Sequence, residues 1–203
     1  MFLGDWHPML RDPLDLFRLS LLAGAAASAI SGDWGAAVRL ALPGLLALVV
    51  RALDVPRAID WIFALAMAFQ GWGNALQLFT ELSWYDNLVH VTLPMSLAPI
   101  AYLALSRLDV VPDPCDRAGG RAQLFGMVFV TLCIGVSAAS FYEIYEWVVV
   151  NWLGQNLFTS EGDTINDMFD GVVGAGIGGA LLATWALGRY HTRRIPRPMA
   201  DAA

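Results

Sequence analysis

Apolar residues form six long runs along this chain of 203 residues. Each run approaches the roughly 17–25 residues that a helix needs to cross a bilayer. Short polar segments such as SGDW and ELSWYD separate the runs, and we find no internal repeat. The pattern therefore predicts an all-α integral membrane protein, with a single domain over residues 1–203 and one bundle of six transmembrane helices. The predicted spans are approximately 14–31, 34–53, 58–80, 87–107, 122–151 and 164–188.

Composition supports a membrane protein. Hydrophobic residues make up 57% of the chain and charged residues 15%, and the mean hydropathy is +0.56. Soluble domains usually carry about a quarter charged residues. The 12 basic residues are all arginine and form no cluster suited to nucleic acid, so we expect no nucleic-acid partner. The two cysteines lie in different environments and predict no disulfide framework.

The distribution of arginine predicts the orientation in the membrane. With a cytoplasmic N-terminus, the three outer segments carry no arginine, and Arg39 within the second span is the one exception to an inner location. By the positive-inside rule, both termini are then cytoplasmic. The Ala-, Gly- and Arg-rich composition is typical of a high-GC bacterial genome. We therefore expect a multi-pass protein of the bacterial inner (plasma) membrane.

Polar residues within four of the predicted spans gather in the outer half of the bilayer. Their spacings of three and four residues place the members of each group on one helical face. From the third span to the sixth, these groups are Gln70, Asn74, Gln77 and Glu81; Asp86 and His90; Glu143 and Glu146; and Asp163, Asp167 and Asp170. Four polar stripes at one depth predict a shared buried site.

Some of these residues have simpler interpretations. Amides such as Gln70 are typical of hydrogen bonding between membrane helices. Asp86 and Asp163 are also placed to cap helix N-termini. Four further acids lie one or more turns inside their spans, where a charged carboxylate costs up to about 2.5–3.5 kcal/mol. Packing alone does not explain these four, which are Glu143, Glu146, Asp167 and Asp170.

A bound cation would offset the negative charge, because the nearby basic candidates are only Arg39 and His90. Protonation of the acids or a cationic substrate are alternatives. One histidine with several carboxylates suits Mg, Ca or Mn and is compatible with Fe or Zn. We predict a divalent metal ion, of undetermined identity, with the ligands His90, Glu143, Glu146, Asp167 and Asp170. Residues expected to surround the ligands or contact substrate are Arg39, Gln70, Asn74, Gln77, Asp86 and Asp163.

Three ordered motifs resemble those of the YjdF-like family of bacterial inner-membrane proteins. They are WYDNLVH (84–90), SFYEIYEW (140–147) and EGDTINDMFDGVVGAGIGG (161–179). The match covers about the last 120 residues. The acids at 167 and 170 depart from the family's spacing, so the resemblance does not extend to Asp170. The resemblance implies the same fold and the same set of motifs, and it implies no particular activity.

The stretch GVVGAGIGGA lies within the sixth span and does not follow a strand, so it predicts close helix packing and not a nucleotide-binding loop. The similar AGAAASAISG in the first span could face the sixth helix or another subunit. Membrane lipids and a homo-oligomer or larger complex are therefore the expected partners.

Three functions stay open from the sequence. The first is a metal-dependent enzyme acting on a lipid or a periplasmic-side substrate. The second is a non-catalytic subunit with a structural cation, and the third is a cation or proton carrier.

Overall fold

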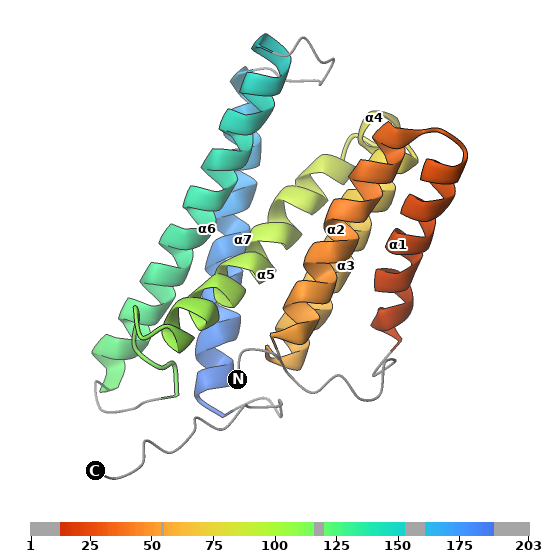
Figure 1. The fold of residues 1–203 in the computed structure, drawn as a ribbon. Coiled ribbons are helices and arrows are strands. Elements are labelled where there is room, and N and C mark those ends of the chain that lie inside the picture. The colour runs from red at the N-terminus through yellow and green to blue at the C-terminus, as the bar shows by residue number, and fades with distance from the viewer. Residues whose placement is uncertain (1–12, 54, 116–119, 153–160, 189–203) are drawn as a thin grey trace.

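The computed structural model describes residues 13–53, 55–115, 120–152 and 161–188, and the regular elements in these ranges are all helices (Figure 1). The predicted all-α class is confirmed for this part of the chain. The helices are α1 (Leu14–Ile30), α2 (Trp34–Ala52), α3 (Arg57–Ala75), α4 (Leu78–Glu81), α5 (Tyr85–Arg107), α6 (Gly120–Asn151) and α7 (Glu161–Ala186).

Four of the described helices are long and apolar enough to cross a membrane, namely α2, α5, α6 and α7. The most apolar is α6, with a mean hydropathy of 2.1 over its best window. α1 has 17 residues, which corresponds to about 25 Å at the usual rise of a helix. α3 carries Arg57 and Asp60 in its first turn. Length and hydropathy therefore indicate several membrane crossings.

The helices pack as two groups, which meet where α3 contacts α5 (Figure 1). α1, α2 and α3 pack against one another, and α5, α6 and α7 form the second group. α5 also packs against α3 and runs obliquely between the two groups in Figure 1. α5 begins and α6 ends at the same end of the second group, where α7 also begins. This end carries the acidic motifs.

The third span ends earlier than predicted. We expected one helix over 58–80, but α3 stops at Ala75, and Gln77 adopts a left-handed conformation with φ of 58°. Tyr85 packs closely against Gly73 and donates a hydrogen bond of 2.8 Å to the carbonyl of Phe69. The short α4 then brings Phe79 back onto the Tyr85 ring, with centroids 5.1 Å apart. The single stripe predicted from Gln70 to Glu81 is therefore wrong beyond the end of α3.

Glycines on α7 allow close packing against α5, as the sequence predicts. A methyl group added at Gly174 would lie 3.0 Å from the carbonyl carbon of Val91 and closer still to its oxygen. One turn later, Gly178 lies equally close to the carbonyl of Met95. The expectation that these small residues serve helix packing is confirmed.

One small residue of α1, Gly24, packs within the same chain. It lies against Trp72 of α3 and Leu40 of α2, whereas Ala23, Ala26 and Ala27 are exposed. α1 forms its main contacts with α2 and α3, so the suggestion that it faces the sixth predicted helix is wrong.

The opposite end of the first group contains a buried network of ion pairs that the sequence did not reveal. Asp15 pairs with Arg18 at 2.5 Å and with Arg51 of α2 at 2.6 Å. Arg18 also pairs with Asp60 of α3 at 2.6 Å. Asp15 and Arg18 are only 2% and 1% exposed. Two acids and two arginines from three helices therefore balance one another in the protein interior.

Candidate metal centre

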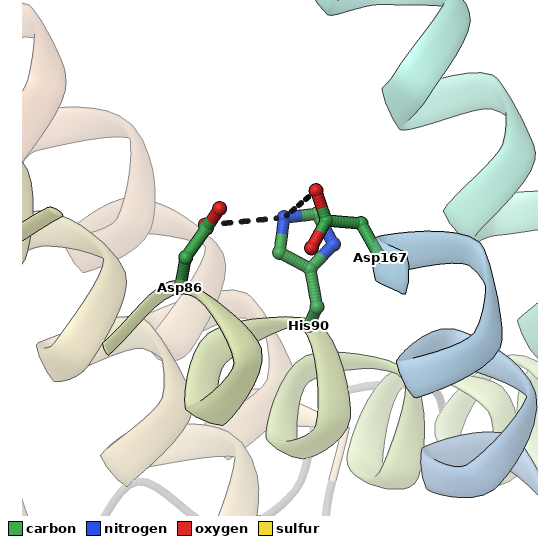
Figure 2. A group of neighbouring side chains, drawn as sticks. All are labelled: Asp86, His90 and Asp167. Atoms are coloured by element: carbon green, nitrogen blue, oxygen red, sulfur yellow. Dashed lines mark ion pairs between the residues drawn. The ribbon is translucent and has the colours of Figure 1, made fainter. Parts of the chain in front are cut away.

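Asp86, His90 and Asp167 converge between the start of α5 and the first turns of α7 (Figure 2). One ligand atom from each lies within 4.8 Å of the other two. The Nε2 atom of His90 is 3.4 Å from Asp86 Oδ1 and 4.0 Å from Asp167 Oδ2. Asp86 and His90 are four residues apart on α5, which places them on one helical face. The three side chains could hold a metal ion.

The three side chains differ in exposure to their surroundings. His90 and Asp167 are buried, whereas the side chain of Asp86 is 35% exposed. The two buried groups lie on helices that Gly174 holds in close contact, two turns beyond Asp167 on α7 and next to His90, at Val91, on α5. The centre is therefore supported on its inner side and open beside Asp86.

Glu143 of α6 lies on the other side of the His90 ring. Its Oε1 atom is 3.7 Å from Nδ1, the nitrogen that does not face Asp86 and Asp167. This oxygen is buried and accepts no hydrogen bond from the described residues. Thr164 of α7 hydrogen-bonds to the same carboxylate. Glu143 thus faces Nδ1 from just beyond hydrogen-bond distance, while Nε2 remains available to a metal ion.

A second polar group continues from Glu143 along α6. The amide of Gln70 on α3 donates a hydrogen bond of 3.3 Å to the hydroxyl of Tyr142, which also hydrogen-bonds to Glu146. The Tyr142 ring packs edge-on against His90, with centroids 5.6 Å apart. Gln70 of α3 is therefore linked to the centre through side chains of α6.

The remaining acids of α7 lie around the three converging side chains. Asp163 is close enough to Asp86 and His90 for electrostatic interaction. Asp170 accepts a hydrogen bond of 2.7 Å from the amide of Asn87. The sequence reasoning did not single out Asn87, although it directly follows Asp86.

Three other residues expected near the centre are located elsewhere. Asn74 donates its amide hydrogen bond to the carbonyl of Gln70 within its own helix. Gln77 lies in the turn after α3. Arg39 is exposed on α2, with its guanidinium against Gly35 at the start of that helix. The structure does not bring these three together with His90.

The donor set indicates which ions could bind. Imidazole suits Zn, Fe and related transition metals, whereas carboxylates suit Mg, Ca and Mn. One imidazole nitrogen with two carboxylates therefore favours a divalent transition ion such as Mn, Fe or Zn over Ca. Among the described residues, neither cysteine belongs to this cluster: Cys115 lies in the loop after α5, and Cys133 is exposed on α6.

Comparisons with known proteins identify a family. Searches of curated proteins and of solved structures found no match. A family described as predicted membrane proteins (DUF2238) matches residues 14–193, which include all seven helices and the three converging side chains. The chain therefore belongs to this family of predicted membrane proteins, and its YjdF-like motifs fit that membership.

Proposed function

We propose that this protein is a metal-dependent enzyme embedded in the bacterial inner membrane, with its centre open to the outer half of the bilayer. A divalent ion would bind to His90 Nε2, Asp86 and Asp167. Such an ion acts as a Lewis acid that polarises a carbonyl or phosphoryl oxygen. The substrate would be a lipid or a molecule reaching the outer face.

The exposure of Asp86 is the observation that carries this proposal. Catalytic metal sites commonly use three protein ligands and keep a further position open, whereas structural sites are closed by protein. The centre has three converging ligands, and one of them is 35% exposed. This arrangement favours a reactive ion over a structural one, because a substrate could approach beside Asp86.

Glu143 supports the same proposal from the other side of the imidazole. Histidine ligands usually donate their second N–H group to a carboxylate or carbonyl, which orients the ring. Glu143 Oε1 lies 3.7 Å from Nδ1 and accepts no hydrogen bond from the described residues, so it is free to approach this N–H group. We therefore assign Glu143 as a positioning residue. Glu146 is left to contact the substrate.

A single domain with six spans and cytoplasmic termini is the topology that best fits this function. The helix ends on the side away from the centre carry Arg18, Arg51, Arg57, Arg107 and Arg121. The described residues at the other end include only Arg39 near it. This asymmetry follows the positive-inside rule if the centre faces outward. We also propose that the protein contacts membrane lipids and self-associates through small-residue faces of α1.

Metal analysis of the purified protein tests the proposed function. We expect about one Mn²⁺, Fe²⁺ or Zn²⁺ per chain in the wild type, and loss of that ion in Asp167→Asn and His90→Ala. Glu81→Gln is the matched control, because Glu81 is an exposed acid on α4 at the same end. A folded wild type that binds no divalent ion would contradict the metal centre.

Activity is tested separately. Hydrolysis or transfer of bilayer lipids and of outer-face substrates should require the ion and disappear in Asp167→Asn. A bound ion that affects thermal stability alone, with no turnover across the panel, would support a structural cation in a membrane subunit instead.

A further inference from the structure

The carboxylates around His90, which include those of Asp86, Asp167, Glu143 and Glu146, carry more negative charge than one divalent ion offsets. Asp86 and Asp167 face Nε2, and Glu143 and Glu146 lie on α6. A histidine that ligates a metal does so as neutral imidazole and contributes no charge. An ion on Asp86 and Asp167 balances those two acids. The negative charge of Glu143 and Glu146 then remains.

The arginines that the structure describes do not supply this charge. The ion pairs at the centre all involve His90, within the described ranges. Arg18 and Arg51 pair with acids in the network of α1, α2 and α3. Arg57 lies over the ring of Trp61, and Arg107 contacts the carbonyl of Leu53. A phosphate or other anionic group would therefore meet an excess of like charge beside Glu143 and Glu146.

The surroundings of these two carboxylates fit an ammonium group. Glu143 and Glu146 are three residues apart and share one face of α6. The side chain of Glu143 is only 5% exposed, and its buried Oε1 accepts no hydrogen bond from the described residues. Tyr142 contacts Glu146, and its ring lies 6.0 Å from that of Tyr145. Carboxylates beside aromatic rings are a common arrangement for binding organic cations.

A second metal ion fits this position less well. Ca²⁺ takes six to eight oxygen ligands, and Mg²⁺ requires an octahedral set. Glu143, Glu146 and the Tyr142 hydroxyl offer fewer protein oxygens than either ion prefers. We propose that Glu146, next to the buried negative charge of Glu143, binds the ammonium group of an amine-bearing substrate beside the metal ion. This inference rests on the proposed function, because Asp86 and Asp167 must be neutralised by that ion.

Binding measurements with two probes test the inference. The protein is placed in nanodiscs of phosphatidylglycerol, loaded with Mn²⁺, and titrated with ethanolamine. A second set of nanodiscs contains phosphatidylethanolamine and shows whether a lipid amine competes with the soluble one. We expect Glu146→Gln to weaken ethanolamine binding by about 10-fold or more, since a charge-assisted contact is lost. Glu146→Asp should restore part of it, and Glu81→Gln should behave as wild type.

The metal and the amine are measured independently, so each proposal can fail alone. Mn²⁺ affinity in Glu146→Gln should stay within about twofold of wild type, because Glu146 is not among the three ligands that converge on Nε2. Unchanged ethanolamine affinity in Glu146→Gln would overturn the ammonium site. A second Mn²⁺ that Glu146→Gln removes would also overturn it, in favour of a second metal. Absence of any bound Mn²⁺ would instead refute the proposed function.

Discussion

Replacing Gly174 by alanine should separate α5 from α7 and weaken the metal centre. The new methyl group would lie 3.0 Å from the carbonyl carbon of Val91 and within van der Waals overlap of its oxygen. The obstacle is backbone, so rotation of a side chain cannot relieve it. Comfortable contact between carbon and a carbonyl oxygen needs about 3.3 Å or more. The two helices must therefore move apart by about 1 Å at this point.

That displacement is large for a metal site. Gly174 lies seven residues after Asp167, which is two helical turns on the same face of α7. Ligand distances in metal sites are held to about 0.2 Å. If Asp167 moves relative to His90 by only part of this helix displacement, the ligand distances change by more than the tolerance. We expect stability to fall by about 1–3 kcal/mol from overpacking, and divalent-ion affinity to fall by about 10-fold or more.

Gly176→Ala is the matched control, because a methyl group at that position of the same helix meets no atom within 4 Å. Thermal unfolding of both variants in nanodiscs, followed by tryptophan fluorescence, gives the stability change. Mn²⁺ titration gives the affinity change. If Gly174→Ala matches Gly176→Ala in both measurements, the close contact with α5 does not support the centre and the reasoning is refuted.

Three further predictions test separate parts of the structure. Glu143→Gln should lower Mn²⁺ affinity by about 10–100-fold, since it removes the carboxylate that faces Nδ1 of His90 and orients the ring; an affinity equal to wild type in a direct titration would exclude this role. Asp15→Asn should destabilise the protein by about 3–5 kcal/mol in thermal or denaturant unfolding, because it leaves buried arginines uncompensated, and a change near zero would contradict the ion-pair network. Cys115 should react with a membrane-impermeant maleimide only after cells are permeabilised, because the proposed topology places its loop in the cytoplasm; labelling of intact cells would reverse the orientation, and Cys115→Ser controls for Cys133.

Helix positions were predictable because a membrane helix needs a long apolar run and polar segments interrupt the sequence only between the runs. Five of the six predicted spans have a matching helix whose described ends agree within a few residues. The exception is informative. Nothing in the composition of GNALQLF (73–79) shows that Tyr85, six residues beyond this stretch, packs against Gly73 close to the end of the helix at Ala75. That contact depends on where α5 lies, which periodicity does not encode.

The helix ends that form the candidate centre could be predicted from the sequence, but the side chains that pair there could not. Spacings of three and four residues place Glu143 and Glu146 on one face of α6, yet they do not show which nitrogen of His90 that face meets. In the structure, Asp86 faces Nε2 and Glu143 faces Nδ1. The sequence suggested the reverse, with Glu143 as a metal ligand and Asp86 as a residue surrounding the ligands. Asp86 lies four residues before His90, and this spacing was the available signal for its position.

The two buried charged clusters among the described residues differ in how their charges are offset. Asp15 and Asp60 form ion pairs with Arg18 and Arg51, so neighbouring side chains offset the charge of these two acids. Among the described residues, the ion pairs of Asp86, Glu143 and Asp167 are all with His90. Burial of an uncompensated charge is costly, whereas a fully paired cluster can persist as structure. A bound cation would therefore stabilise the second cluster, and under the proposed function the identity of that cation determines which reaction the protein catalyses there.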